Sequence, residues 1–500
     1  MLNTAVTGVK VRDGLITHAI AERQSTEDRF TIKAAVFIDC TGDGRLGAEA
    51  GAPYREGREA RDEHNETLAQ ETADDKRLGS TLLFQAREHD RPMPYAPPSW
   101  ARRFTEDDLR LRSHATAGQD LGLEFGYWWV EWGGRLDTIR DGETVRDELL
   151  AIMLGAWDHI KNGGDHGAEN WALDWFGFLP GKRESRRFVG QHVLCEADVT
   201  GSVPFADAIA YGGWFIDTHP PEGIDAPDQP PCDQRPVPYL YDIPLRVCIS
   251  ATTANLMFAG RNISATHVAF ASTRVMATCA VIGQGVGTAA AWAVRHDCQP
   301  ADLPDNREAM QAIQQQLLRD DVFLVGCLNR AADDLAGRAA ITASSELPDG
   351  QADNVVSGQT RCVHGTDGAP PERANPGTHR WMSDPAQELP GWIQLSWAQP
   401  IQPTQVQLVF DTGLHRVLTF SHADGYTALM KWGRPQPETV KDYTIEAQVE
   451  GQWRQIVRVH GNYQRRVVHR IEADFFNALR INVTATNGVD HVRICEVRVY

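Results

Sequence analysis

The sequence predicts an α/β region followed by an all-β region, and three observations carry this prediction. Residues 34–38 are continuously apolar and end in a glycine-rich turn, as expected of a parallel strand covered on both faces. Residues 275–294 carry no charge but are rich in Ala, Gly and Thr, which favours a helix buried in an α/β domain over a transmembrane span. Beyond about Gly350, short alternating segments separated by turns predict a β-sandwich.

Composition limits the partners and cofactors. The chain has 500 residues, of which 42% are hydrophobic and 23% charged, enough for two to four domains. A net charge of −18 repels phosphate backbones and acidic lipids, so we expect neither a nucleic-acid nor a membrane partner. The nine cysteines are scattered singly, without a C-x-x-C pair, and we predict no metal site and no iron–sulfur cluster. The first residues lack a signal-peptide pattern, which favours a cytoplasmic location.

The N-terminal elements follow from local patterns. Alternating residues 5–11 and 15–20 flank Asp13-Gly14 and predict a β-hairpin, and the strand at residues 34–38 comes next. Residues 54–76 are charged and polar. The Pro-rich stretch at residues 92–98 marks a domain crossing.

The middle of the chain combines helices with long loops. A capping box at Thr105 predicts a helix start, and apolar residues from Val145 to Ile160 recur at helical spacing before Gly163. Residues 165–245 are aromatic and Pro-rich and predict the walls of a pocket without a sheet. A strand at residues 256–259 is expected to complete the first sheet, and a helix follows at residues 306–318. The strands predicted for the last region are residues 392–397, 405–410, 443–449, 453–459, 478–483 and 491–499.

The turn from Gly42 to Gly47 satisfies the pattern G-x-G-x-x-G after a buried strand. One interpretation is a dinucleotide-binding fingerprint. However, residues 54–76 are a charged tract where a second parallel strand should follow. The alternative is a turn that touches a dinucleotide whose pyrophosphate is held elsewhere, and glycine would still be required where a ligand approaches the backbone.

Four segments in order resemble one family: AAVFIDCTGDGRLGAEAGAPYREG, PGKRESRRFVGQHVL, YGGWFIDTHPPEG and the run from Tyr241 to Ala291. Together they resemble the bacterial FAD-dependent oxidoreductase family, distantly related to the flavin subunit of heterodisulfide reductase, over about residues 1–300. The resemblance implies a glutathione-reductase-like FAD-binding domain with an inserted substrate domain. Family members begin with a strand and a true G-x-G-x-x-G, so we expect this domain to be incomplete, truncated by its first βαβ unit.

The expected domains follow from this resemblance and from the composition. Residues 1–60 and 240–300 would form the FAD-binding domain, and residues 80–240 the inserted substrate domain. A helical connector would occupy residues 301–340. Residues 341–500 would form a galactose-binding-like β-sandwich.

The resemblance also implies FAD as the cofactor. Thr41, Gly42, Asp43 and Gly44 correspond to the family's second FAD-contacting turn, while Gly260, Arg261 and Asn262 fall at its ribityl and flavin end. A helix opening near Gln284, Gly285, Val286 and Gly287 would direct backbone N–H groups at the flavin. The alternative for these glycines is tight helix packing.

Candidate catalytic residues are Arg183, Arg186, Arg187 and His267. The three arginines resemble a family motif beside the flavin and suit a carboxylate substrate or a phosphate, but pairing with Glu184 explains them equally well. His267 could shuttle a proton, or it could be a satisfied hydrogen-bonding residue. Arg274 has the same two interpretations.

The last region, residues 345–500, resembles the discoidin or coagulation-factor C-type module. Many relatives bind calcium, and Asn354 and Glu496 match ligand positions, whereas Ser357 stands where an aspartate is usual. Trp381 or Trp432 could present a ring to a glycan, or the module could be purely structural.

The leading hypothesis is an FAD-dependent oxidoreductase acting on a small organic molecule, with a carbohydrate-derived substrate as one candidate. The rival is a truncated, redox-inactive remnant that binds carbohydrate through the β-sandwich. A third hypothesis has a separately encoded N-terminal piece completing the site.

Overall fold

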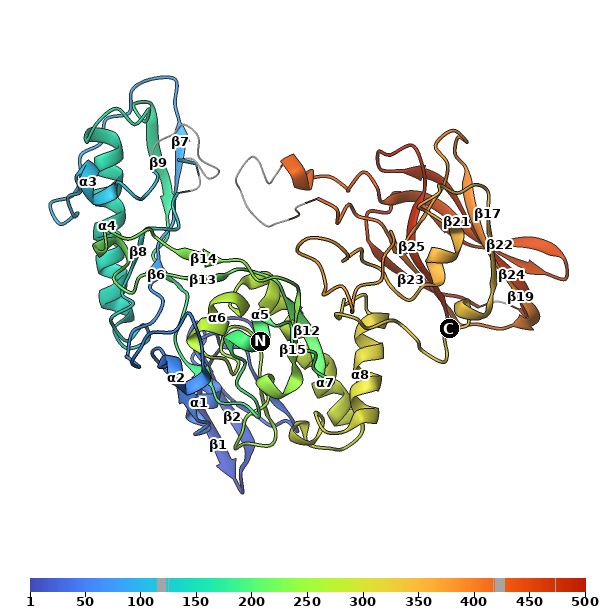
Figure 1. Cartoon of the computed structure of the whole chain (residues 1–500), viewed down its shortest axis with the longest axis horizontal. Coiled ribbons are helices and arrows are strands. Elements are labelled where there is room, and N and C mark those ends of the chain that lie inside the picture. Colours follow the sequence, from blue (N-terminus) through green and yellow to red (C-terminus); the bar gives the residue numbers. More distant parts are fainter. Residues whose placement is uncertain (115–122, 125, 417, 419–427, 473) are drawn as a thin grey trace. The chain divides into compact units, whose positions relative to one another are not determined.

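The computed structural model describes residues 1–114, 123–124, 126–416, 418, 428–472 and 474–500. The chain divides into two compact units, residues 1–313 and the described residues from 314 to 500, and each is described by itself. Figure 1 colours the chain from blue at the N-terminus to red at the C-terminus.

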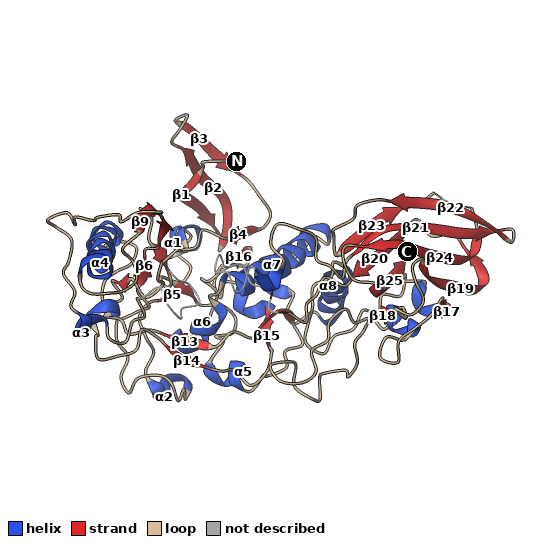
Figure 2. Ribbon diagram, turned by 90° about the horizontal axis from the view of Figure 1, so that it is seen from above, coloured by secondary structure: helices blue, strands red, loops and turns tan. Residues whose placement is uncertain are grey.

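A three-stranded antiparallel sheet opens the first unit. β1 (Ala5–Arg12) and β2 (Leu15–Arg23) form the predicted hairpin, and β3 (Asp28–Ile32) adds a strand that the sequence analysis missed. Asp13 and Gly14 both adopt positive φ values, 51° and 74°, which a tight two-residue hairpin turn requires. Figure 2 shows these three strands side by side.

The predicted parallel sheet is present as a pair of short strands. β4 (Phe37–Asp39) lies parallel to β16 (Leu256–Phe258), with Phe37 opposite Leu256 and Asp39 opposite Phe258. Buried Asn255 ties this pair to the hairpin, because its amide accepts from the Ile16 N–H at 2.9 Å and donates to the Ile16 carbonyl at 2.9 Å. The expectation that the later strand completes the first sheet is confirmed.

Helix α7 (Met276–Arg295) follows this strand and packs by one face. Gly285 faces β12 (Ala208–Gly212), where a Cβ atom at Gly285 would lie 2.6 Å from the Ile209 carbonyl oxygen. The expectation that a helix opens near Gln284 is wrong, because α7 begins at Met276 and Gln284–Gly287 lie in its interior. Within the described chain, α7 alone is long and apolar enough to cross a bilayer, and 39% of its most apolar window is buried.

The inserted part of the first unit is built around α4 (Gly142–Asn162). Its predicted apolar face packs with β7 (Phe84–Glu88) and surrounding aromatic side chains in one core. Gly163 ends the helix as predicted. The capping box at Thr105 is also confirmed and begins the short helix α3 (Glu106–Leu109).

Residues 165–245 contain several short strands, so the expectation that they form no sheet is wrong. β9 (Trp171–Phe176) pairs with β7, β12 pairs with β15 (Tyr241–Pro244), and β13 (Ile216–Thr218) pairs with β14 (Asp233–Arg235). The other helices and strands of this unit are α1 (Arg45–Glu49), β5 (Tyr54–Arg55), α2 (Arg61–His64), β6 (Ser80–Thr81), β8 (Glu131–Trp132), β10 (Gly181–Lys182), β11 (Arg187–Phe188), α5 (Glu196–Thr200) and α6 (His267–Thr273).

The second unit is a β-sandwich, as predicted, preceded by α8 (Arg307–Arg319), where the unit boundary falls. One sheet has the strand order β17-β19-β24-β21-β22 and the other β18-β25-β20-β23. Their inward side chains form one apolar core. The strands are β17 (Ala340–Ala343), β18 (Trp381–Met382), β19 (Gly391–Ile401), β20 (Gln405–Phe410), β21 (Val440–Val449), β22 (Gln452–Val459), β23 (Arg466–Arg470), β24 (Phe476–Thr486) and β25 (Arg493–Val499).

Two glycines of α7 provide a matched test of its packing. We expect Gly285→Ala to destabilise the first unit by about 1–3 kcal/mol, because the new methyl group meets strand backbone. Gly287→Ala should stabilise it by up to about 1 kcal/mol, because no atom lies within 4 Å of its Cβ position and alanine is the better helix former. Urea unfolding of both variants measures the difference. Equal effects of the two substitutions would contradict this packing.

Candidate functional site

The segment Lys182–Arg187 contributes side chains to two neighbouring clusters. Lys182 and Ser185 both donate hydrogen bonds to the carboxylate of Asp43. Glu184 instead contacts His267, and Arg187 contacts Glu59. This segment therefore connects the glycine turn after β4 to the start of α6.

Asp43 is the centre of the first cluster. Its carboxylate accepts from Lys182 Nζ at 2.6 Å, from Ser185 Oγ at 3.0 Å and from Arg261 Nη2 at 3.0 Å. Burial opposes ionisation, but Lys182 and Arg261 hold the pKa of Asp43 below its usual value. The parallel pairing of β4 with β16 thus brings the two predicted cofactor segments, residues 41–44 and 260–262, together.

The glycines of the G-x-G-x-x-G pattern have a packing role. Gly42 and Gly44 adopt φ values of +83° and +72°, which favour glycine. A Cβ atom at Gly44 or Gly47 would lie 2.7 or 2.4 Å from the ring of Phe188. Thr41 accepts a hydrogen bond from the Arg45 N–H through its hydroxyl oxygen, which caps α1. The close approach at Gly44 and Gly47 is therefore to Phe188, whereas a Cβ atom at Gly42 would lie at an ordinary contact distance of 3.5 Å from Arg261 Nη2.

The second cluster is a buried ion-pair network. Arg187 is 1% exposed and pairs with Glu184 and with Glu59, the latter at 2.7 Å. Burial alone would raise the pKa of Glu184, but His267 and Arg187 lower it to about 2. Arg187 also donates to the Ala265 and Gly57 carbonyls, so its pairing is structural. For Arg187, the structure supports the alternative of internal pairing with Glu184.

His267 is the first residue of α6 and is oriented by carboxylates. Its Nδ1 lies 2.9 Å from Glu184 Oε2, and its backbone N–H donates to Glu59 at 2.8 Å. A carboxylate at Nδ1 places the proton on that nitrogen, so in the neutral ring the lone pair is on Nε2. Thr266 caps the helix by accepting from the Ala269 N–H.

A second buried histidine lies in a similar arrangement. His219 Nδ1 is 2.7 Å from Glu131, and its Nε2 is 3.2 Å from Asp217 and 3.2 Å from Arg274. Arg183 lies 3.3 Å from Glu131 and donates to the Trp128 carbonyl at 3.0 Å. Burial opposes ionisation of Glu131, but Arg183 and His219 lower its pKa.

His219 and His267 line the same cavity, which has a volume of about 470 Å³. Its walls combine proline faces with hydrogen-bonding side chains such as Gln70 and Thr218. Cys232 also lines it, and burial together with the charge of Asp217 raises the pKa of that thiol to about 11, so the thiol is protonated at neutral pH. A small polar molecule fits a cavity of this size and lining.

The predicted site residues fall into three groups. Those at the Asp43 cluster are Thr41, Gly42, Asp43, Gly44, Arg186, Gly260, Arg261 and Asn262, and those at the two histidine networks are Arg183, Arg187 and His267. Gln284, Gly285, Val286 and Gly287 are placed in the interior of α7, with Gly285 against Ile209. In the first turn of α7, burial raises the pKa of Cys279 to about 11, and the charges of Arg261 and Arg274 oppose that rise.

The sequence analysis missed the acids and the second histidine of these networks. Glu59, Glu131 and the neighbours Asp217 and His219 come from three separate segments, and their partners lie up to 208 residues away in the chain. Two local signals were present: an acid stands among cations around Glu184, and Asp217 and His219 lie in the family-like segment YGGWFIDTHPPEG.

The β-sandwich residues singled out from the sequence have different environments. Trp381 is fully buried and donates to the Ser345 carbonyl, so it cannot present its ring to a glycan, whereas Trp432 is 61% exposed. Asn354 donates to the Arg380 carbonyl. Glu496 is buried beside Arg498, and burial raises the pKa of Glu496 to about 8.

The Asp43 cluster has features that fit a polar cofactor such as FAD. Both side-chain amide atoms of Asn262 and the Nε of Arg186 are buried without a hydrogen-bond partner among the described residues. Buried polar atoms without partners are costly unless a ligand or water satisfies them. Gly42 offers a backbone approach with no Cβ, next to the Arg261 guanidinium.

Removing the charge of Glu184 tests the buried network. We expect Glu184→Gln to cost about 3–5 kcal/mol at neutral pH, because it breaks a buried pair with Arg187. A lowered folded-state pKa contributes stability that is complete above the ordinary value of 4.5 and is lost as pH falls toward about 2. The variant should therefore lose less stability than the wild type across that window. Urea unfolding at a series of pH values measures this, with exposed Glu88→Gln as the control, and parallel pH profiles for wild type and E184Q would contradict it.

No curated protein matches the chain by sequence. Among solved structures, the chain is similar to a CBM32 module from Clostridium perfringens in complex with GalNAc-β-1,3-galactose, at 14% identity and a TM-score of 0.24 over 34% of this chain and 99% of that one. It is also similar to the family 32 module of C. perfringens NanJ in complex with galactose, at 11% identity and a TM-score of 0.24. This match covers 33% of this chain and 96% of that one. A third similar structure is the family 32 module of Streptococcus pneumoniae EndoD. Its identity is 15% and its TM-score 0.24, over 34% of this chain and 99% of that one.

A family model described as FAD dependent oxidoreductase matches residues 1–317. This match covers more than half of the chain and includes the Asp43 cluster and both histidine networks. The chain therefore belongs to the FAD-dependent oxidoreductase family.

Proposed function

We propose that the chain is an FAD-dependent oxidoreductase that acts on a small polar organic substrate, such as a carbohydrate derivative, in the cavity lined by His219 and His267. The observation that carries this proposal is the pairing of His267 Nδ1 with buried Glu184 on the wall of that cavity. FAD, when bound, supplies the hydride chemistry. The protein supplies binding, orientation and proton transfer.

The residues that would hold FAD are those of the Asp43 cluster. The Gly42 backbone leaves room for close approach, and Arg261 and Lys182 are cations beside it. Asn262 adds an amide that no described side chain satisfies. A ligand bound at this cluster would replace some of the internal contacts of Asp43 with contacts to its own polar groups.

His267 is the proposed proton-transfer residue. In the proposed arrangement Nε2 accepts the proton of a substrate hydroxyl, while Glu184 keeps the proton on Nδ1 and stabilises the imidazolium that forms. Arg183 and Arg187 would act through their carboxylate partners, Arg183 on Glu131 and Arg187 on Glu184. In this proposal they are positioning residues.

The substrate class follows from the cavity lining. Gln70 and Thr218 offer neutral hydrogen bonds, while the prolines at positions 220, 221 and 230 offer flat apolar faces. Alternating hydroxyl and C–H faces of a sugar-like molecule match both kinds of wall. The two arginines of the lining are paired with acids, Arg58 with Asp74 and Arg235 with Asp233, so they do not create a strongly cationic pocket.

The rival function, a redox-inactive protein that binds carbohydrate through the β-sandwich, rests on one exposed ring. Trp432 is 61% exposed and could stack on a sugar. This function would be favoured if the whole chain binds glycans on an array and does not bind FAD.

Arg261→Met tests the cofactor proposal. We expect the variant to bind FAD at least about tenfold more weakly than the wild type, a loss of about 1.4 kcal/mol, because one cation of the cluster is removed. Quenching of FAD fluorescence on titration with protein measures the affinity. Arg29→Met, on exposed β3, serves as the matched control. A wild-type chain that does not bind FAD would refute the proposal.

His267→Gln tests the proton-transfer role. We expect turnover to fall by about 10²–10⁴-fold, with FAD affinity unchanged, because a general base is lost while the Asp43 cluster is intact. Anaerobic bleaching of bound flavin by a panel of sugars, sugar alcohols and sugar acids measures the reaction. His18→Gln, in β2, is the control. Bleaching of the H267Q variant at the wild-type rate would exclude this role.

A further inference from the structure

Three histidines and one glutamate meet in the inserted part of the first unit. They are Glu106, His114, His159 and His166, and one donor atom from each lies within 4.8 Å of all the others. The three imidazole rings are mutual neighbours, with centroid separations of 4.8–5.1 Å. These residues line neither the His219–His267 cavity nor the Asp43 cluster.

The distances between donor atoms suit one small ion. Oε2 of Glu106 lies 3.1 Å from His159 Nε2, 3.4 Å from His114 Nε2 and 3.8 Å from His166 Nε2. Zinc binds nitrogen and oxygen ligands at about 2.0–2.1 Å in a tetrahedron, whose edges are then about 3.3–3.4 Å. The three separations from Glu106 bracket that edge length, while the donor atoms of the whole set lie within 4.8 Å of one another, so side-chain movements would complete the tetrahedron.

The backbone orients two of the rings toward this point. Nδ1 of His114 lies 2.6 Å from the Arg112 carbonyl oxygen and Nδ1 of His159 lies 3.1 Å from the Phe104 carbonyl oxygen. A carbonyl accepts only, so each Nδ1 carries a proton, and in the neutral ring each Nε2 presents its lone pair to the cluster. Fixing the outer nitrogen in this way is typical of metal-binding histidines.

The fold supplies a rigid frame for the four side chains. Glu106 is the first residue of α3 and His159 lies in the last turn of α4. A Cβ atom at Gly163 would lie 2.5 Å from His159 Nδ1, so the chain passes tightly beside that ring. His114 and His159 are buried and His166 is partly buried, whereas Glu106 is two-thirds exposed and leaves an entry path from solvent.

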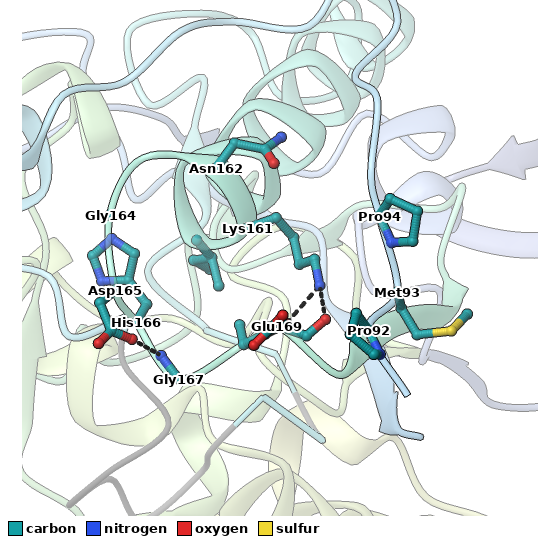
Figure 3. A pocket seen from close by; sticks show the side chains of 12 residues that line it. Pro92, Met93, Pro94, Lys161, Asn162, Gly164, Asp165, His166, Gly167 and Glu169 are labelled. Atoms are coloured by element: carbon teal, nitrogen blue, oxygen red, sulfur yellow. Dashed lines mark hydrogen bonds between the residues drawn. The ribbon is translucent and has the colours of Figure 1, made fainter. Parts of the chain in front are cut away.

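His166 lies on a loop that hydrogen bonds from Lys161 hold in place. Lys161 donates hydrogen bonds to the carbonyls of Ala168, Glu169 and Trp171 at 2.6–2.8 Å, which fixes the chain after His166. Figure 3 shows His166 and Lys161 on the wall of a cavity of about 660 Å³ next to the cluster. His166 therefore connects the cluster to an open space.

We propose that Glu106, His114, His159 and His166 bind one divalent transition-metal ion, with Zn²⁺ as the best match. Three imidazoles and one carboxylate are donors that zinc accepts, and a tetrahedral arrangement is its preference. The alternative is an ion-pair cluster of protonated histidines, but one carboxylate cannot balance three imidazolium rings packed at these distances. Bound zinc would join α3, the end of α4 and the two segments that carry His114 and His166.

Cobalt provides a direct probe of this site. The metal-free full-length chain should bind one Co²⁺ with the visible absorption of a tetrahedral ion, and Zn²⁺ should displace it and raise the thermal unfolding temperature. We expect His159→Ala to weaken Co²⁺ binding by at least about tenfold and to abolish the zinc-induced rise. His89→Ala removes a nearby histidine outside the cluster and should behave as the wild type.

A second variant distinguishes the loss of a metal ligand from misfolding. Glu106 is exposed, so Glu106→Gln should leave the fold intact and still weaken Co²⁺ binding by about tenfold. Sulfur-to-cobalt charge-transfer bands would mean that some of the nine free cysteines bind the ion, and they would overturn the proposal if they were the only signal. Wild-type binding by both E106Q and H159A, or absence of Co²⁺ binding by the wild type, would also overturn it.

Discussion

Burial of the Arg187 guanidinium between Glu184 and Glu59 is the interaction on which both parts of the site depend. A cation in the interior is tolerated only when carboxylates and carbonyls satisfy it, and here two of each do so. The same two acids orient the ring and the backbone of His267. The network thus fixes the start of α6 relative to the segment Lys182–Arg187, from which Lys182 and Ser185 reach Asp43.

Periodicity and turn chemistry predicted the larger elements of the fold correctly. The hairpin around Asp13-Gly14, the amphipathic helix α4 and the strands of the β-sandwich each have a pattern contained within a few consecutive residues. The helix predicted at residues 275–294 matches α7, but its interior glycines were wrongly interpreted as a helix opening that contacts the flavin, although Gly285 lies against β12. The paired strands between residues 165 and 245 were missed because they are short and some of their partners lie far away in sequence.

The candidate site was predictable in part for the same reason. The segment around Arg187 and the turn at Asp43 were found because their charged residues and glycines are adjacent in sequence. Glu59 and Glu131 join the site only through folding, whereas Asp217 lies in the family-like segment YGGWFIDTHPPEG, which did not predict its partners. The four residues of the proposed metal site are separated by 8, 45 and 7 positions, which matches no short metal-binding motif.

The short segment Lys182–Arg187 contacts both Asp43 and His267, and it therefore couples ligand binding at Asp43 to the position of the His267 ring. A ligand that competes for the Asp43 carboxylate displaces Lys182, Ser185 or Arg261, and the first two lie within two residues of Glu184, the acid that holds His267. Occupancy that displaces either of these two residues would then alter the alignment of the proposed base His267. Within this family, changes at position 43 should be accompanied by compensating changes at positions 182 and 185.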